Sequence, residues 1–546
     1  MAKPLTYQQL TNFGVNGLNT QNNPATLDPS YLTSADNVVL RESGRISFRK
    51  GFKQKVVPTG TAIGSMVEHN DSGTNKIFAS YGTSIYTIDF TSPNAAFPSS
   101  GADVKHTVTD STGDWQFVNF NNRLHCFHTG VIPQRYDGAL SSGSRWTAHA
   151  TDPATITTLF DPSCGMGFYG RIWCGGVTEA KDVVYWSNLL DGDDWTGGDT
   201  GVLDLSKIWG TDEVVAIAPF YGQLIIFGKN NIAIYDSPTA VGTLALNEVI
   251  SGIGCVSRDS VQAIGDDLVF LSATGLRSLA RTAEKDKLPL TDLTVNIKDT
   301  VIRNIGQSNN VKSVYVESEG VYIMSFVDLN INYVFDFKHT TPQETPRITT
   351  WTFDNDREPA SMINTELYSG LLVGQKDGSI AGYEGYFDTD LAWVSSAVSY
   401  TNSSFTSNIG SVWIPLGQTI SAALLKNMIL VLEGGSGAVL YLKWYKDFGM
   451  TPSSITSIDL RPATTGSTAL WGASSSRYGT TTVSHTHDAA LHPSNSLYTP
   501  IYGLREYRTS LTGSAKHLKL NLSIESNGFD ASIQDLSLLT KEGKIR

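Results

Sequence analysis

The sequence is poor in charged residues and in cysteine, and it lacks long apolar runs. Only 17% of its 546 residues are charged, and heptads rich in Ala, Glu, Lys and Leu are absent, which excludes a mostly helical fold. No apolar run approaches the roughly 18 residues that span a bilayer, and residues 1–6 have no apolar segment typical of a secretory signal. We therefore expect a protein made in a cytoplasm, without a membrane-spanning segment.

The four cysteines form no C-x-x-C pair, which excludes the usual redox and zinc-finger spacings. We expect them to be reduced and buried. They are Cys126, Cys164, Cys174 and Cys255.

Glycine is abundant, with 50 residues, and 40% of the chain is hydrophobic. Together with many Ser, Thr and Asn residues, this composition is typical of short strands joined by turns and predicts an all-β fold. The length favours two or three domains. A sequence-specific nucleic-acid binder should carry a basic patch, whereas the net charge is −12 and the densest basic stretch, Arg49 to Lys55, is short; this balance still permits nucleic acid as cargo.

A repeated pattern of two strands joined by a tight turn runs through the middle of the chain. Its aromatic end recurs at steps of 50, 49 and 50 residues, at Tyr86, Tyr136, Tyr185 and Tyr235. A period near 50 with several strands per unit is typical of propeller blades, because stacking blades in a ring buries sheet faces that one blade leaves open. We predict a β-propeller of six or seven blades over residues 59–390; the alternative is a set of unrelated hairpins.

The flanks of this region differ from it. Residues 1–58 are turn-rich and predict an N-terminal arm with an interface strand, which contacts a neighbour rather than forming a core of its own. Residues 391–409 are rich in Ser, Thr and Asn and indicate a linker. Residues 410–546 predict a C-terminal β-sandwich-like domain, with a hairpin over 427–445 and a projecting loop near 450–500.

Three groups of residues have side chains that can bind metals. Asp191 and Asp193 alternate in a Gly-containing loop, as calcium ligands do, but the EF-hand offsets are missing, and a solvated loop over Trp195 is the preferred interpretation. His485 and His487, with His492 nearby, form an H-x-H pair that resembles the iron-binding stations of some phage spikes, although a mobile polar loop is favoured.

The third group is His125 and His128 around Cys126, for which packing is favoured because no second pair is adjacent. No nucleophile elbow, P-loop or dinucleotide fingerprint occurs. A sialidase propeller would repeat the Ser-x-Asp-x-Gly-x-x-Trp box, and only one distorted version occurs, at 187–195. We therefore expect no enzyme activity and no cofactor.

Several segments, taken in order, resemble the tail tubular or nozzle proteins of short-tailed bacteriophages. The resemblance covers roughly residues 10–385, with a weaker match at the end of the chain. The segments are Phe13–Thr20, Asn23–Leu27, Ala35–Leu40, Gly44–Phe52, Gly167–Trp173, Tyr185–Ser187, Phe220–Leu224 and Glu542–Arg546.

The resemblance implies a structural virion protein of the tail, made in the bacterial host cytoplasm. It implies a homohexameric ring below the portal and adaptor (head-to-tail connector), with fibres or a spike or needle attached. Such a ring retains packaged double-stranded DNA and conducts it non-specifically during ejection. The resemblance identifies no channel or gate residues. Two alternatives stay open: a phage carbohydrate-binding or depolymerase propeller acting on host glycans, and a peptide-binding scaffold, although WD-type signatures are lacking.

Overall fold

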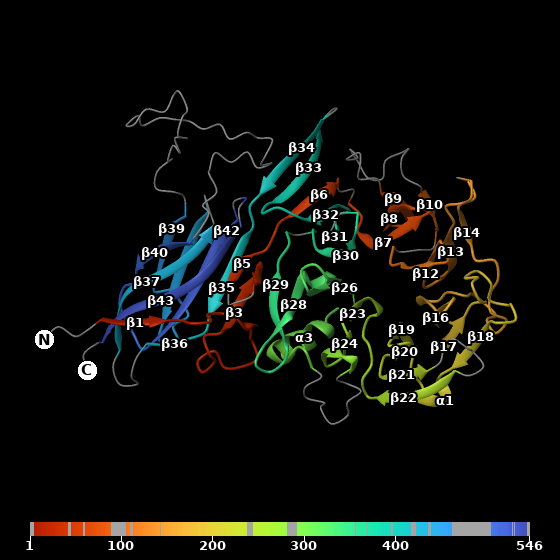
Figure 1. Cartoon of the computed structure of the whole chain (residues 1–546), viewed down its shortest axis with the longest axis horizontal. Helices are drawn as coiled ribbons and strands as arrows, with labels where there is room; N and C mark the ends of the chain where they lie inside the picture. Colours follow the sequence, from red (N-terminus) through yellow and green to blue (C-terminus); the bar gives the residue numbers. More distant parts are fainter. Residues whose placement is uncertain are drawn as a thin grey trace.

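The structure is a computed structural model in which nearly every element is a β-strand (Figure 1). Among the residues it describes, the helices include α1 (Ser206–Trp209) and α3 (Lys298–Ile305), and none is long and apolar enough to cross a membrane. The described residues are 5–41, 45–57, 60–88, 105–109, 113–141, 143–236, 244–280, 292–308, 310–354, 356–367, 370–394, 397–416, 422–434, 438–460, 504–526, 528 and 530–542. The predicted all-β class is confirmed.

Within the described residues, six units of four strands form the full blades of a β-propeller; four of them are separate sheets, and two are parts of larger sheets. The first strands of successive blades contact one another and so form the inner wall. Three blades comprise β7 (Ile63–Asp71), β8 (Thr74–Tyr81), β9 (Ser84–Ile88) and β10 (Lys105–Thr107); β11 (Gln116–Phe120), β12 (Arg123–His128), β13 (Val131–Tyr136) and β14 (Trp146–Ala148); β15 (Cys164–Phe168), β16 (Arg171–Val177), β17 (Ala180–Trp186) and β18 (Gly201–Asp204). The others comprise β19 (Val214–Phe220), β20 (Gln223–Gly228), β21 (Asn231–Asp236) and β22 (Ala245–Ser251); β26 (Val311–Val316), β27 (Val321–Phe326), β28 (Ile331–Thr340) and β29 (Pro346–Trp351); β30 (Pro359–Thr365), β31 (Gly370–Gln375), β32 (Ile380–Tyr383) and β6 (Phe52–Val56).

A smaller three-stranded sheet lies in the ring between the blades β19–β22 and β26–β29. It consists of β23 (Gln262–Ile264), β24 (Asp267–Ser272) and β25 (Gly275–Ser278), and the short helix η3 (Arg258–Ser260) precedes it. Phe270 packs into the cluster of the blade before it, while Leu271 packs with Tyr322 of the blade after it. The predicted six or seven blades are therefore six full blades and one truncated one.

The tyrosines that defined the repeat occupy equivalent places in four blades. Tyr86, Tyr136, Tyr185 and Tyr235 all lie in the third strand of their blade, and all are at most 5% exposed. Each therefore packs between neighbouring blades, which explains why the repeat step equals one blade.

Tight turns join the first two strands of several blades. Asn121 and Asn122 both have positive φ, as do Tyr169 with Gly170 and Tyr221 with Gly222. Two consecutive positive φ values define the type I′ turn, whose twist suits a two-residue hairpin and which favours Asn and Gly. These two-residue turns thus set the register between the first two strands of these blades.

Strand β6 closes the ring, because it pairs antiparallel with β32 from the other end of the propeller. The residues before β6 form β1 (Leu5–Gln9), β2 (Gly17–Leu18), β3 (Tyr31–Asp36), β4 (Val38–Leu40) and β5 (Ile46–Phe48). Their apolar side chains, including Phe13, Leu32 and Val38, lie buried in the chain's own largest core. The segment expected to be an arm for a neighbour is thus built into this chain, because β2, β3 and β5 pair with strands of the propeller or of the C-terminal domain.

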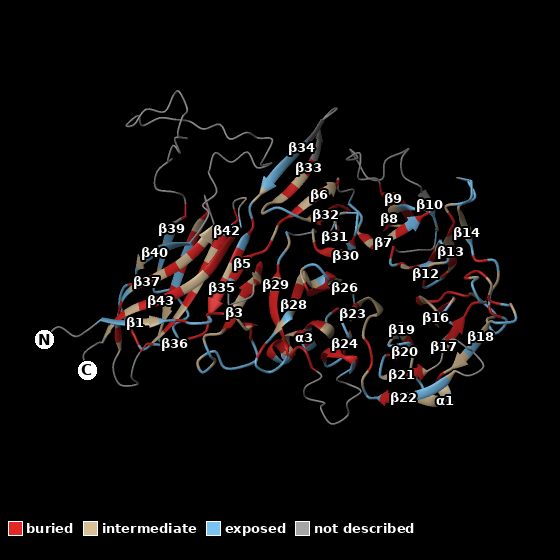
Figure 2. Cartoon of the chain, viewed as in Figure 1, coloured by how far each residue is buried: buried red, intermediate tan, exposed pale blue. Residues whose placement is uncertain are grey.

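The C-terminal domain is a two-layered β structure, seen to the left in Figure 1. One sheet contains β1, β4, β5, β37, β40, β41 and β43; the other continues the blade β26–β29 through β2, β3, β35, β42, β38 and β39, with β36 on β42. Strand β42 alternates buried and partly buried side chains, and Figure 2 shows the buried residues along these strands. The C-terminal strands are β35 (Thr406–Ser411), β36 (Ile414–Pro415), β37 (Ala423–Gly434), β38 (Val439–Lys446), β39 (Ser454–Asp459), β40 (Leu504–Ser510), β41 (Ser514–Ala515), β42 (His517–Glu525) and β43 (Ala531–Glu542).

The predicted hairpin over 427–445 is wrong. Strand β37 pairs with β40 and β43, whereas β38 pairs with β39 and β42 in the opposite sheet. Leu430 and Leu442 belong to one core between the sheets, so the two apolar strands bury their faces by facing each other rather than by pairing.

The expected linker 391–409 is largely strand. Its first part lies in the hairpin β33 (Asp388–Val394) and β34 (Ala397–Ser403), which extends the sheet of β6, and its last part is β35. The expected loop near 450–500 is described only to residue 460, and that described part contains β39.

Candidate functional site

A large cavity lies at one mouth of the propeller axis. It has a volume of about 760 Å³ and is lined by residues at the start of the inner strands, among them Gly64, Asp114, Ser163, Val214 and Lys312. A central cavity is where propellers gather side chains from many blades, so it is the first place to look for chemistry.

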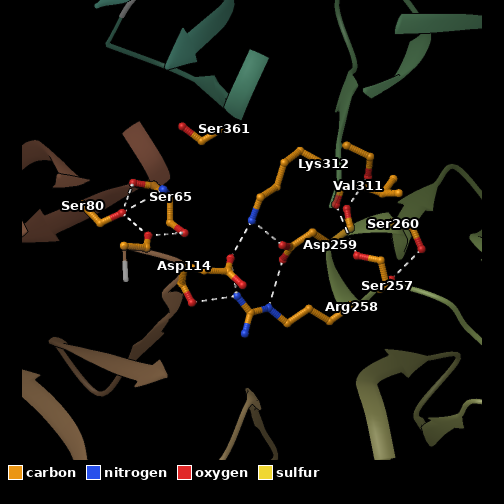
Figure 3. Close-up of polar contacts among 12 residues, drawn as sticks. Ser65, Ser80, Asp114, Ser257, Arg258, Asp259, Ser260, Val311, Lys312 and Ser361 are labelled. Carbon is orange, nitrogen blue, oxygen red and sulfur yellow. Dashed lines mark hydrogen bonds and ion pairs between the residues drawn. The ribbon is translucent and has the colours of Figure 1, made fainter. Parts of the chain in front are cut away.

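Four charged side chains from distant parts of the sequence meet at the wall of this cavity (Figure 3). Arg258 Nη2 lies 2.8 Å from Asp114 Oδ1, and Arg258 Nε lies 3.2 Å from Asp259 Oδ1. Lys312 Nζ lies 2.7 Å from both Asp114 Oδ1 and Asp259 Oδ2. Two cations and two anions therefore alternate in a closed quartet, which we call the axial quartet.

The quartet connects three units of the ring, which are not all neighbours. Asp114 precedes β11, Arg258 and Asp259 lie in η3, and Lys312 lies in β26. The Arg258 guanidinium also donates to the backbone carbonyl of Ser163, just before β15. The arginine and lysine side chains are only 10% and 11% exposed, so solvent screens their pairing with Asp259 less than their pairing with Asp114, which is 57% exposed.

The charges in the quartet stabilise one another. Burial alone would raise the pKa of Asp259, but Lys312 and Arg258 outweigh it and hold that pKa below its usual value. Burial would likewise lower the pKa of Lys312, yet Asp259 and Asp114 raise it. The Asp259 carboxylate is therefore held ionised and both carboxylates are paired with cations, an arrangement that fixes the blades.

Three further charged residues line the rim of the same cavity. Glu213 binds Lys181 at 3.3 Å and also contacts Lys229. The mouth of the propeller is therefore spanned and rimmed by paired charges. Sequence reasoning did not single out any of these residues, and the only signal was that charged residues stand where inner strands begin.

A buried cluster joins two of the predicted groups. Asp193 lies beside His125 and a histidine that the sequence analysis did not name, His149, and their nearest ligand atoms are 3.0 to 3.8 Å apart. The loop approaches so closely that a Cβ on Gly192 would lie 2.9 Å from His125 Nε2, which explains the glycine. Asp193 also contacts Arg135.

The protons in this cluster can be assigned. Burial lowers the pKa of His125 to about 3 and lowers that of His149 well below its usual value, so both rings are neutral. Trp195 Nε1 donates to His149 Nδ1 at 3.1 Å, which places the His149 proton on Nε2, from where it is donated to His125 Nδ1 at 3.0 Å. Neither nitrogen facing Asp193 then has a free lone pair for a cation, and Arg135 supplies the positive charge instead.

The remaining predicted groups lie elsewhere. Asp191 Oδ1 accepts from the Asp193 backbone amide, so the two carboxylates do not converge. His128 packs against Trp115, with ring centroids 5.0 Å apart. His485, His487 and His492 lie outside the described residues. All four cysteines are buried and free, as predicted.

No family model and no curated protein matches this sequence. Among solved structures, the chain is similar to the WD40 domain of Neurospora crassa Pan2, with 8% identity, a TM-score of 0.36, and coverage of 59% of this chain and 88% of that one. It is also similar to the extracellular domain of a protein described as a one-component system of B. thetaiotaomicron, with 13% identity, a TM-score of 0.40, and coverage of 84% and 64%. Neither likeness bears on function.

Proposed function

We propose that this chain is a structural virion protein that forms the distal tail tube, or nozzle, of a short-tailed bacteriophage. In this proposal, copies of the chain assemble as a homohexameric ring that contacts an adaptor ring and fibres or a spike, and DNA passes through the ring. The proposal starts from the resemblance in the segments between Phe13 and Phe52.

The observation that carries the proposal is the structural place of those segments. Arg49 is fully buried, donates from Nε to Asn37 Oδ1 at 2.8 Å, and lies 3.8 Å from the centre of the Phe405 ring. A Cβ at Gly51 would lie 1.9 Å from the Phe387 carbonyl oxygen, so only glycine fits. Residues 49–51, part of the Gly44–Phe52 segment, thus occupy the junction where the propeller joins the C-terminal domain.

This junction suits a subunit that must resist mechanical force. One eleven-stranded sheet runs from the blade β26–β29 into the C-terminal domain, so the two parts share backbone hydrogen bonds rather than a flexible linker. The propeller mouth is spanned by the axial quartet, so a DNA channel in this proposal is formed between copies of the chain. The net charge of −12 favours a wall along which phosphate does not adhere.

Negative-stain electron microscopy of the purified full chain, with its mass measured by light scattering, tests the proposal. We expect rings or short tubes with six-fold symmetry and a central channel. A monomer at micromolar concentration, or a trimer that releases reducing sugar from bacterial capsule, would contradict it and would favour the glycan-acting alternative.

A further inference from the structure

A second large cavity lies on the outer face of the sheet that joins the two domains. It has a volume of about 550 Å³, within the range of ligand sites in proteins. Its floor crosses strands β29, β3, β35, β42 and β38. We call it the junction groove.

The register of the sheet places polar side chains on this floor. Asp36 pairs with Asn408, and Asn408 pairs with Ser523. Two residues further along β35, Gly410 pairs with Asn521. Opposite residues share a face, and the intervening Ile409 and Leu522 are buried in the core, so the polar set faces the groove. Gly410 keeps the floor open, since a Cβ there would lie 3.3 Å from Asn521 Oδ1.

Many of these polar groups have no partner among the described residues. The Oδ1 atom of Asn521 is buried without a hydrogen bond. The side chains of Asn408, Ser523 and Tyr445 also form no hydrogen bond within the described part of the chain, and all three line the groove. Amides and hydroxyls that both donate and accept, beside an aromatic ring, match the hydroxyls and the apolar ring face of a sugar.

The charges of the groove argue against other occupants. Among the described residues that line it, only Asp36 and Lys443 are charged, and Asp36 already accepts from Thr350 and Thr352. A polynucleotide would require several cations along its backbone. A protein partner would require an apolar anchor at the centre of the contact, whereas β35 and β42 present amides, a serine and a glycine to this groove.

We infer that the junction groove binds a neutral oligosaccharide through Asn408, Asn521 and Ser523, with Tyr445 packed against a sugar ring. This inference does not rest on the tail-tube proposal, because the groove lies on one copy of the chain.

The test uses the purified full chain on an array of immobilised microbial oligosaccharides with neutral hexose and N-acetylhexosamine units, followed by calorimetry with the strongest binder. We expect the double variant Asn408→Ala/Asn521→Ala to weaken binding at least tenfold. Asn364→Ala, an exposed asparagine on β30 outside the groove, serves as the matched control and should bind like the wild type.

A second variant keeps the test decisive if the double variant does not fold. Ser523→Trp fills the groove without removing the amides, and it should abolish binding. The inference is overturned if no oligosaccharide binds at millimolar concentration, if both variants bind like the wild type, or if only single-stranded DNA or heparin binds. Ring formation is scored separately by microscopy, so failure of one proposal leaves the other intact.

Discussion

Lys312 and Asp114 are 198 positions apart in the sequence, yet the lysine Nζ and the aspartate Oδ1 lie 2.7 Å apart across the propeller mouth. Arg258 and Asp259 complete the axial quartet on the same side. Contacts of this sequence separation form only when the ring has assembled, so the quartet reports on the closed propeller.

Replacing Lys312 with Met tests the energetic role of the quartet. The change leaves two carboxylates facing one arginine, and we expect the free energy of unfolding to fall by about 2 to 3 kcal/mol. Urea denaturation monitored by circular dichroism measures it. Lys376→Met is the matched control, because Lys376 lines the same cavity but is exposed, and it should change stability by less than about 0.5 kcal/mol. Equal effects of the two variants would show that the axial quartet does not stabilise the fold.

Stability should depend on pH through the buried histidines. His125 and His149 have pKa values lowered by burial, so below about pH 6.5 the unfolded chain binds protons that the folded chain does not. The free energy of unfolding should therefore fall as the pH drops from 7 towards 4. We expect the free energy of unfolding of the His149→Gln variant to fall less steeply over this range. The two slopes should differ by up to about 1.4 kcal/mol per pH unit.

Urea titrations at several pH values measure this slope. Val118→Ala loosens the neighbouring blade core without removing a titratable group, so its difference from the wild type should stay constant with pH. A His149→Gln slope identical to that of the wild type would show that His149 binds protons equally in the folded and unfolded states, and would contradict the lowered pKa.

Gly192→Ala tests the close approach of the aspartate loop to His125. The added Cβ would lie 2.6 Å from Ile172 Cδ1 and 2.7 Å from His125 Cε1, so we expect a loss of about 1 to 3 kcal/mol. Gly198→Ala in the same loop region has no atom within 4 Å of the new Cβ and should be nearly neutral. Thermal unfolding of both variants distinguishes a packing role from a loop that tolerates any residue.

Arg49→Lys tests the junction between the two parts. Lysine keeps the charge but loses the planar fork that reaches Asn37 and Asp388 and stacks on Phe405. We expect a loss of about 2 kcal/mol and faster limited proteolysis between the propeller and the C-terminal domain. Lys53→Arg, an exposed change on β6, should leave both measurements unchanged. Wild-type protease resistance in Arg49→Lys would contradict the role given to the junction.

The sequence predicted the propeller because local patterns determine it. Tyr86, Tyr136, Tyr185 and Tyr235 repeat at the blade period, and turn residues such as Asn121 fix the hairpins. It did not predict the pairing of the N-terminal strands with the C-terminal domain, because backbone pairing between segments hundreds of residues apart leaves no periodic trace. For the same reason β37 and β38 were mistaken for a hairpin: alternation reports a buried face, not the partner strand.

The candidate sites show the same division. The alternation Asp191, Asp193 was visible, but the proton arrangement around Asp193 depends on His149 and Trp195, which lie in other segments. The junction groove was invisible, because Asn408 and Asn521 are ordinary polar residues until the sheet brings their strands together.

Strand β1 pairs with β43, so the first and last described strands of the chain lie side by side and the propeller is an insertion within the C-terminal domain. This topology imposes an order on synthesis. The propeller can close once β32 has left the ribosome. Strand β1 can pair only after β43 has been synthesised, and most of the two-layered domain forms at that stage. A chain interrupted after β34 would carry a finished ring beside an exposed apolar segment at residues 10–48.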